Sequence, residues 1–151
     1  IYPLLARLEK EGLIQGHDQV RGEHLRRVEY RITEEGRAEL RDWAGTVHRL
    51  QEDRDAFLLQ AIFLDLVPDE QILPILEDYA RNQRRIEQES EEHSGMLAAG
   101  LTPLMQERLS RRPAAEHERI KALKARAFAG KAKVARARAE WAEECIELLS
   151  G

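Results

Sequence analysis

The opening 36 residues constrain the fold more than any other part of the chain, because their pattern changes from helical to extended and back. Apolar residues recur at helical spacing from Ile1 to Leu8, and Gly12 then follows a lysine in the way that ends many helices. Residues 27–32 alternate between charged and apolar side chains, as in a half-buried β-strand. Thr33, followed by two glutamates, is a good N-cap for a new helix. The pattern predicts a helix that leads into a two-stranded ribbon with a charged tip, which is the core of a winged helix.

Three linked motifs in this stretch resemble the PadR family of bacterial transcriptional regulators. The motifs are Tyr2-Pro3-Leu4-Leu5, then Leu8-Glu9-Lys10-Glu11-Gly12-Leu13-Ile14, then Tyr30-Arg31-Ile32-Thr33-Glu34-Glu35-Gly36. Family members carry a pattern like LYPxLxRLexeGLI, a wing, and YxLTexGrxxL, and the spacing matches nearly position for position. The resemblance implies a winged helix followed by C-terminal helices that form a homodimer.

The beginning of the chain differs from the family pattern. Family members start their winged helix with two further helices, whereas this sequence opens on Ile1, already inside the predicted helix. We therefore expect the natural protein to carry roughly 40 more residues before this point, from the usual size of two helices and their loops.

Composition narrows the class of protein. Of the 151 residues, 42% are hydrophobic and 34% are charged, which indicates a helix-rich soluble chain. The net charge is −4, so attraction to DNA requires a local basic patch. Cys145 is the only cysteine, which excludes an intrachain disulfide and a cysteine-pair zinc site. No apolar run approaches the roughly 20 residues that cross a bilayer, and we expect a cytoplasmic protein.

The segment between the two predicted strands, residues 16–26, is a candidate DNA contact. In a winged helix this tip lies beside the minor groove or the phosphates, where arginine and histidine donate to phosphate oxygens. The resemblance also gives Tyr2 the place of the family tyrosine at the front of the recognition helix, which usually faces DNA. The predicted DNA-binding residues are Tyr2, Arg7, Lys10, Arg21, His24, Arg26 and Arg27.

These candidates also have a purely structural interpretation. In it the ribbon is a solvated hairpin whose arginines pair with Asp18, Glu23 and Glu29. Arg7 would then pair with Glu11, four places further along the same helix. The residues expected in the core, with no functional role, are Leu4, Leu5, Leu8, Leu13 and Ile14.

The remainder of the chain is predicted to be helical, on both sides of a polar junction. A helix is expected from Thr33 to about residue 50, with Trp43 packed in a core or between domains. The polar residues 51–54 mark the expected junction between a partial winged-helix domain and a helical dimerisation and effector domain. These domains cover residues 1–50 and 51–151. The segment 56–67 is apolar almost all round, which predicts a helix buried on most sides, with Asp55 as its cap.

Three more helices are expected after this segment. The first runs from about residue 68 to about residue 99, and Pro74 is expected to kink it or to move its start. A short helix begins at Thr102, and a long one runs from Pro113 to about residue 149.

The long C-terminal helix contains a basic segment. Residues 119–138 hold eight arginines and lysines and no acid. This segment would bind phosphate, recruit an acidic partner protein, or complement the acidic residues 87–92 within the chain or across a dimer. Gly130 in its middle suggests a close helix crossing or a bend.

The resemblance implies partners for the second half of the chain. Its members form homodimers whose winged helices are spaced for adjacent half-sites of a palindromic operator on double-stranded DNA. Segment 56–67 and the helix that carries Trp141 would supply the dimer interface. Several members respond to phenolic acids or hydrophobic cationic drugs. The aromatic residues that would line such a pocket, with core packing as their alternative role, are Trp43, Phe57, Phe63, Tyr79 and Trp141.

No catalytic or metal-binding constellation stands out in the sequence. The five histidines are scattered, no glycine-rich phosphate loop occurs, and the glutamates around Cys145 would raise the pKa of its thiol. We predict no enzyme, no metal and no cofactor. The predicted fold is mainly α with a small two-stranded β wing, and the predicted function is a dimeric repressor relieved by a small hydrophobic or phenolic effector. The alternatives are a helical protein-interaction module without DNA binding and a winged-helix regulator of another family.

Overall fold

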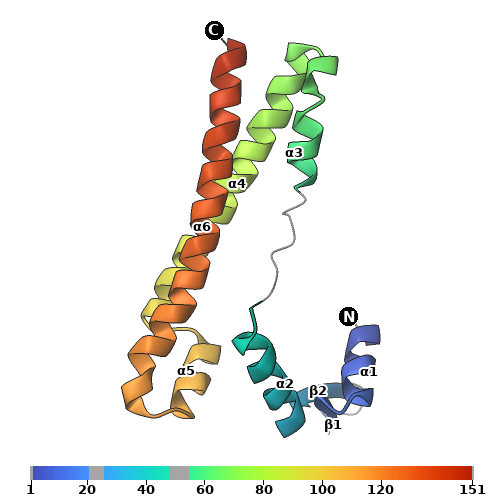
Figure 1. Ribbon diagram of the computed structural model, residues 1–151, viewed down its shortest axis with the longest axis vertical. Helices are drawn as coiled ribbons and strands as arrows, with labels where there is room; N and C mark the ends of the chain where they lie inside the picture. The colour runs from blue at the N-terminus through green and yellow to red at the C-terminus, as the bar shows by residue number, and fades with distance from the viewer. Residues whose placement is uncertain (1, 21–25, 48–54, 151) are drawn as a thin grey trace. The chain divides into compact units, whose positions relative to one another are not determined.

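The computed structural model describes residues 2–20, 26–47 and 55–150, without the side chains of residues 2, 18–20, 26 and 27. The chain divides into two compact units, Ile1–Asp53 and Arg54–Gly151, which are treated separately below (Figure 1). The domain boundary predicted between residues 50 and 51 lies outside the described residues. The described elements confirm the predicted class, since they are mainly helices with one two-stranded antiparallel sheet.

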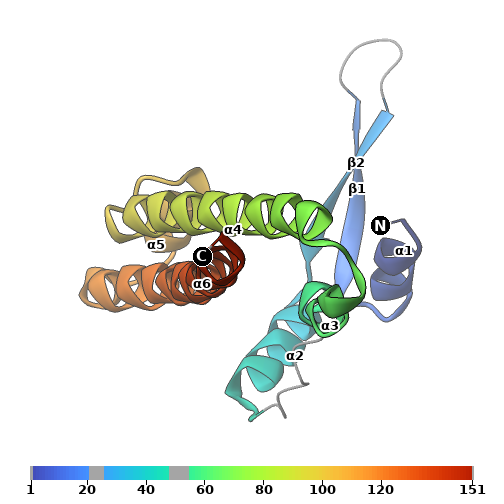
Figure 2. The same cartoon turned by 90° about the horizontal axis from the view of Figure 1, so that it is seen from above.

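The first unit is a helix, a ribbon and a second helix. Helix α1 (Tyr2–Lys10) is followed by Gly12, whose φ of 72° lies in the left-handed region that favours glycine. Strands β1 (Ile14–Val20) and β2 (Arg26–Ile32) pair in the antiparallel sense, with Ile14 opposite Ile32 (Figure 2). Helix α2 (Glu34–Gly45) begins after Thr33, whose side-chain oxygen accepts a hydrogen bond from the Gly36 N–H.

Two expectations for the first unit are wrong. Helix α2 ends at Gly45 instead of about residue 50, because the backbone turns extended at Thr46. Trp43 is 61% exposed and so does not pack in the core of this unit, whereas its packing between domains stays a prediction. The expected core is not enclosed: Leu4 is 51% exposed, and the other four leucine and isoleucine side chains are half-buried. Among the residues described in this unit only Gly36 is buried, because two short helices and one ribbon leave much of their apolar surface uncovered.

The second unit is built on a long helical hairpin. Helices α4 (Asp69–Ala98) and α6 (Ala114–Ser150) run antiparallel and lie side by side along most of their length (Figures 1 and 2). Helix α5 (Pro103–Ser110) lies between them in the chain, and Thr102 caps it as expected. Before the hairpin come the short helix α3 (Ala56–Ala61), capped by Asp55 as expected, and the 3₁₀ helix η1 (Leu64–Leu66).

The core of this unit is the seam between α4 and α6. Helix α4 contributes the buried residues Ile72, Leu76 and Ala80 near its start. Helix α6 contributes only alanines to its buried positions, which permits close approach of the two helices. These alanines are Ala125, Ala132, Ala135, Ala139 and Ala142. Near the turn of the hairpin, Leu97 and Met105 pack against Ala125 to close that end.

Three predictions for the second unit need correction. The apolar segment 56–67 is not one helix and is not buried: it divides into α3 and η1, neither of which contains a buried residue. Phe57 of this segment contacts rings on α4 and α6, whereas its other large apolar side chains include several exposed ones, namely Leu58, Leu59, Ile62, Phe63 and Leu66. Of the two effects expected of Pro74, a shifted helix start does not occur, since α4 begins at Asp69 and contains Pro74, whereas the kink stays a prediction. Gly130 neither interrupts α6 nor marks a close crossing within the chain, because a Cβ built there would meet nothing within 4 Å.

Candidate nucleic-acid interface and effector pocket

Hydrogen bonds fix the ribbon to α1. Glu9 lies near the end of α1, and its Oε1 accepts from the backbone N–H of Gly16 on β1 at 2.9 Å. Just after the end of β2, the Thr33 hydroxyl donates to the Gly12 carbonyl oxygen at 2.7 Å, and the Thr33 N–H donates to the Leu13 carbonyl oxygen at 3.1 Å. The ribbon is therefore joined by hydrogen bonds to α1 and to the two residues that lead from α1 into β1.

Gly36 allows helix α2 to approach the start of the ribbon. A Cβ built on Gly36 would lie 2.1 Å from the Leu13 carbonyl oxygen and 2.9 Å from the Ile32 Cγ1. The first of these neighbours is backbone, which cannot move aside as the end of a flexible side chain can. The glycine of the third sequence motif is therefore required by the packing of α2 against β1.

The predicted DNA-binding residues are distributed over α1 and the wing. Arg7 and Lys10 are exposed on α1, and the Arg7 Nε lies 3.7 Å from the Glu11 Oε1, with both side chains at least half exposed. Such an exposed pair is weak, so it leaves the Arg7 guanidinium available to a phosphate. The residues whose side chains, or whole positions, lie outside the described part of the chain are Tyr2, Arg21, His24, Arg26 and Arg27.

The structure adds one charged pair to the ribbon. Arg31, in the middle of the third sequence motif, has its Nε 3.3 Å from Glu29 Oε1. The Arg31 side chain is 66% exposed and that of Glu29 is 42% exposed, so this pair lies on the surface of the ribbon and encloses no core.

Three of the five predicted pocket aromatics meet in the second unit. The rings of Phe57 and Tyr79 are stacked, with centroids 3.8 Å apart and an interplanar angle of 12°. Trp141 contacts both rings edge-on, at centroid distances of 5.9 and 6.2 Å. Phe63 is 56% exposed, and Trp43 belongs to the other unit. Three of the five aromatic residues chosen from the sequence therefore form one cluster, and these ring contacts do not include the other two.

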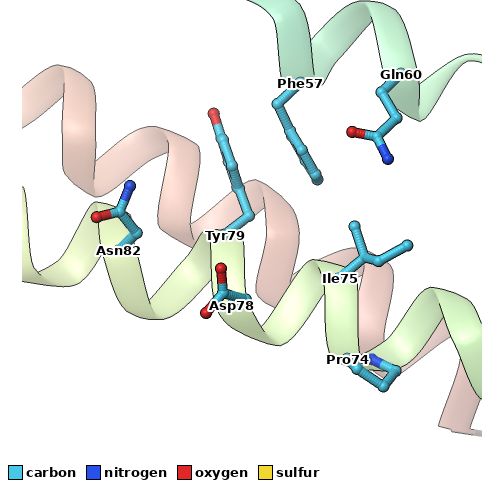
Figure 3. Close-up of a pocket in the computed structure, with 7 residues that line it drawn as sticks. All are labelled: Phe57, Gln60, Pro74, Ile75, Asp78, Tyr79 and Asn82. Atoms are coloured by element: carbon cyan, nitrogen blue, oxygen red, sulfur yellow. The ribbon is translucent and has the colours of Figure 1, made fainter.

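A cleft of about 400 Å³ opens beside this cluster, on α3 and the first turns of α4 (Figure 3). This volume lies within the range of small-ligand sites in proteins, about 300 to 1,000 Å³. Its lining combines two aromatic rings with apolar and polar side chains, namely Phe57, Gln60, Pro74, Ile75, Asp78, Tyr79 and Asn82. The α4 members recur at helical spacing and so share one face, but only the structure brings α3 to that face.

Asp55 connects the cleft to the start of the second unit. One carboxylate oxygen of Asp55 accepts from the Phe57 N–H at 2.9 Å and thereby caps α3. The other accepts from the Tyr79 hydroxyl at 3.0 Å and lies 3.5 Å from the Arg138 Nε of α6. Asp55 therefore contacts residues of α3, α4 and α6, and one of these residues, Tyr79, also lines the cleft. From the sequence, Asp55 was expected only to cap the helix that follows it.

Ion pairs cross the middle of the α4–α6 seam. Glu87 is 8% exposed, and its two carboxylate oxygens accept from Arg136 of α6 and Arg84 of α4. Arg84 also donates twice to Glu143 of α6, at 2.9 and 2.6 Å, and Arg136 reaches Glu91 at 2.6 Å. The prediction that the basic segment complements the acidic residues of α4 within the chain is confirmed for Arg136.

These contacts shift the ionisation of the paired groups. Hydrogen bonds from Arg136 and then Arg84 lower the pKa of Glu87, and the hydrogen bond from Arg84 lowers the pKa of Glu143. Partial burial and then Glu144 raise the pKa of the Cys145 thiol, so burial contributes more than the neighbouring acids that the sequence suggested.

The described residues form neither a metal site nor a membrane-spanning helix. No group of three or more histidine, cysteine, aspartate or glutamate side chains in this part of the chain is placed to hold a metal ion. Within the same residues, no helix combines the length and apolar character needed to cross a bilayer.

Comparisons with known proteins identify relatives of the chain. Residues 1–42 match the model of the transcriptional regulator PadR-like family. The negative transcriptional regulator PadR of Bacillus subtilis (strain 168) is 28% identical over 85 residues, which are 56% of this chain and 47% of that protein. The matched region therefore spans about half the length of this curated relative.

Solved structures of PadR proteins have the same fold. The crystal structure of Bacillus subtilis PadR in complex with operator DNA aligns with a TM-score of 0.64 and 21% identity, covering 98% of this chain and 75% of that one. The structure of the same protein in complex with p-coumaric acid aligns with a TM-score of 0.57 and 19% identity, covering 99% and 76%. At this identity the similarity establishes a common fold.

Proposed function

We propose that the chain, whose residues 1–42 match the PadR-like family of transcriptional regulators, binds operator DNA as a homodimer and represses transcription until an effector binds. It would be a regulator and not an enzyme, because the matched family and the curated relative are both described as transcriptional regulators. The observation that carries the proposal is the match of residues 1–42 to the family, which covers α1, the wing and most of α2. The protein would act in the cytoplasm, together with the DNA.

The geometry of the first unit supports DNA binding. Glu9 and Thr33 hold the ribbon to α1, so a helix in the major groove and a wing on the adjacent backbone would keep one fixed spacing. Arg7 and Lys10 are exposed in the last turns of α1. Cations on α1 and on the wing would then neutralise phosphates on either side of the groove.

Pairing of two copies would give the operator its symmetry. A dimer with twofold symmetry presents two wings to two half-sites, so the expected operator is a palindrome on double-stranded DNA. The second unit is the proposed pairing unit, because α3 and η1 expose several large apolar side chains that one copy leaves uncovered. These are Leu58, Leu59, Ile62, Phe63 and Leu66.

The cleft beside Phe57 and Tyr79 is the proposed effector site. Its size and its stacked rings suit a small hydrophobic or phenolic compound. A ligand that turns the Tyr79 ring would draw its hydroxyl away from Asp55. Because Asp55 begins the second unit's first helix, this would loosen the start of that unit and change the spacing of the DNA-binding halves.

Binding of the full-length protein to its own promoter region, measured at two salt concentrations by mobility shift, tests the DNA-binding part of the proposal. The double change Arg26→Ala and Arg27→Ala should weaken binding across sequences and reduce the log–log salt slope by about two. The matched control is Arg81→Ala with Arg85→Ala on α4, which removes the same charge from exposed positions of the other unit. Unchanged affinity and slope in the wing variant would remove the wing from the mechanism.

The effector part is tested with p-coumaric acid and, separately, with a hydrophobic amine. Binding to the protein is followed by the quenching of tryptophan fluorescence, and release of DNA by mobility shift. Tyr79→Phe keeps the ring and removes the hydroxyl, so ligand affinity should change less than about threefold while ligand-induced release of DNA is weakened. The proposed site is wrong if Phe57→Ala leaves the affinity for a bound probe unchanged.

A further inference from the structure

The basic segment of α6, residues 119–138, has only part of its charge neutralised within the chain. Three of its eight cations pair with a carboxylate of the described residues, namely Lys121, Arg136 and Arg138. None of the other five forms an ion pair with a residue that the structure describes. Like charges at this density repel one another, so the segment is stabilised by an anion from outside the described residues. The five cations are Arg119, Lys124, Arg126, Lys131 and Lys133.

These five cations form two rows on α6. Helix α4 lies along one side of α6 (Figure 2), and α6 buries an alanine toward it at every seventh position from Ala125 to Ala139. The first row directly follows these alanines in the sequence, and the second row directly precedes them. Because each residue turns a helix by about 100°, the rows lie that far to either side of the seam. The first row is Arg126 and Lys133, with Arg119 seven residues earlier, and the second is Lys124 and Lys131. We call the two rows together the basic face.

The basic face is accessible. Four of its cations are exposed, and Lys124 is half-buried. Between the rows, on the side of α6 away from α4, Leu123 is 61% exposed and Val134 is 52% exposed. A Cβ built on Gly130, in the middle of this surface, would meet nothing within 4 Å. A partner can therefore approach the helix backbone closely between the two rows.

The length of the basic face suits an extended polyanion. From Arg119 to Lys133 the helix rises by about 21 Å, at about 1.5 Å for each residue. Over that length double-stranded DNA carries about 12 phosphate charges, at one for about every 1.7 Å. A single small anion would reach one or two of these cations, whereas a nucleic acid can reach the whole row.

The width of the helix selects duplex DNA among the nucleic acids. A helix with its side chains is about 10 to 12 Å across, and the major groove of B-form DNA is about 12 Å wide, with a phosphate backbone along each edge. Rows on both sides of α6 can then each reach one strand. The major groove of A-form RNA is too deep and narrow for this contact. Proteins bind single strands largely through exposed aromatic rings, whereas Phe128, the one aromatic residue of the segment, packs against His93.

The composition of the segment disfavours a membrane surface and a protein as partners. A helix that lies in a membrane surface buries a broad face of large apolar side chains. Residues 119–138 contain four large apolar side chains, and two of these, Ile120 and Phe128, pack against the core at the turn of the hairpin. Protein interfaces are commonly centred on tryptophan or tyrosine, and the segment contains neither.

We propose that the basic face of α6 binds the phosphates of double-stranded DNA without reading its sequence, as a contact additional to the wing. The side chains between the rows carry no donor or acceptor for base edges, so the contact depends on charge and groove shape. It goes beyond the operator binding proposed above and does not depend on it, because these cations belong to the second unit. Phosphate contacts of this kind hold a regulator on DNA between its operators and allow it to slide.

The test is binding of the full-length protein to duplex DNA of unrelated sequence, followed by fluorescence anisotropy at several salt concentrations. Arg126→Gln with Lys133→Gln removes two charges from the first row. It should weaken binding by about 5- to 20-fold and reduce the log–log salt slope by about two. Arg126→Lys with Lys133→Arg keeps the charges and should bind within about twofold of the unmodified protein. The matched control, Arg81→Gln with Arg85→Gln on α4, should leave affinity and slope unchanged.

A second background separates the basic face from the wing. In the Arg26→Ala and Arg27→Ala variant, the glutamine changes on α6 should reduce the salt slope by about two more, because separate contacts add. On operator DNA the same changes should weaken binding by the same factor as on unrelated DNA. Glutamine changes without effect on unrelated DNA in either background would overturn this proposal. Operator binding by the first unit would still be judged by the wing variant alone.

Other polyanions distinguish the competing partners. Duplex DNA should bind more tightly than double-stranded RNA of the same length, poly-glutamate, or vesicles of phosphatidylcholine and phosphatidylserine. Tighter binding of poly-glutamate or of vesicles, lost in the glutamine variant, would overturn DNA as the partner, and equal binding of RNA would overturn the fit to the groove. Unchanged DNA binding with a raised dimer dissociation constant would assign these cations to a contact between copies. Circular dichroism checks that each variant is folded.

Discussion

The two units of this chain are stabilised in different ways. The first unit buries only Gly36 among its described residues and is held by hydrogen bonds between backbone atoms and the side chains of Glu9, which accepts, and Thr33, which donates. The second unit buries a seam between two long helices, with apolar residues towards both ends of α4 and with Gln83, Glu87 and Ser90 between them, and charged pairs cross its middle. A helix and ribbon fixed by a few backbone contacts can present exposed side chains to a partner, whereas a long buried seam stabilises the second unit itself.

Because the two units are stabilised in different ways, substitutions in one unit should change different measured quantities from substitutions in the other. A change in the second unit should reduce the free energy of unfolding of the hairpin before it affects the geometry of the wing. A change at the contacts of the first unit should affect DNA binding with little effect on the hairpin. The predictions below test this separation, from the largest expected effect to the smallest.

Leu76→Ala should have the largest effect on stability. Leu76 is 1% exposed in the α4–α6 seam, so its truncation leaves a cavity and should lower the free energy of unfolding of the second unit by about 2 to 5 kcal/mol. Leu104→Ala, at a position 80% exposed on α5, is the control and should change it by less than about 0.5 kcal/mol. Denaturant unfolding followed by circular dichroism measures both, and equal effects would show that the seam is not the core.

Gly36→Ala should disturb the first unit. The added Cβ would lie 2.1 Å from the Leu13 carbonyl oxygen, so α2 must move away from the ribbon, at a cost of about 1 to 3 kcal/mol. We expect weaker operator binding and faster amide exchange in the ribbon, with the helical hairpin unaffected. Gly45→Ala is the control, because its Cβ would meet nothing within 4 Å. If Gly36→Ala and Gly45→Ala have the same effect on operator binding, the close packing of α2 against the Leu13 carbonyl is contradicted.

Glu87→Gln should reduce stability in a pH-dependent way. The pKa of Glu87 is lowered in the folded state by Arg136 and Arg84, so its carboxylate stabilises the seam fully above the ordinary value of 4.5. That contribution is lost as the pH falls through the lowered folded pKa. The variant should therefore be less stable than the unmodified protein at neutral pH, and the difference should shrink in acid. Thermal unfolding between pH 7 and strongly acidic buffer measures this, and a difference that grows in acid would contradict it.

Arg31→Ala should have the smallest effect on stability. Arg31 and Glu29 form an exposed pair on β2, and such pairs contribute about 0 to 1 kcal/mol. Amide exchange of the ribbon should be nearly unchanged in the variant. A large increase in exchange would mean that exposed pairs, and not the contacts of Glu9 and Thr33, hold the wing.

Local signals in the sequence were sufficient for most of the secondary structure. Gly12, Thr33, Asp55 and Thr102 act through their own neighbours, so their turns and caps were predictable from residue type. The segment 56–67 was not, because its apolar character shows that it needs cover and does not show whether the same chain supplies it. Its exposure became visible only in the fold.

The candidate sites were predictable to different extents. The aromatic residues Phe57, Tyr79 and Trp141 were chosen by type and do meet, although they lie on three different helices. The contact of Asp55 with Tyr79 was not predictable, because it joins residues 24 positions apart through tertiary packing. The partner of Arg136 was anticipated from the opposite charges of two segments, whereas the choice of Glu87 depends on the alignment of α4 and α6.

We propose above all that the first unit binds DNA and that the second unit pairs two copies of the chain on one operator. The most direct test is the mass of the complex between the full-length protein and a palindromic operator duplex, measured by light scattering or native mass spectrometry. The account predicts two chains on one duplex, and one chain or none on a duplex that carries a single half-site at the same concentration. A single chain bound with full affinity to either duplex would contradict it.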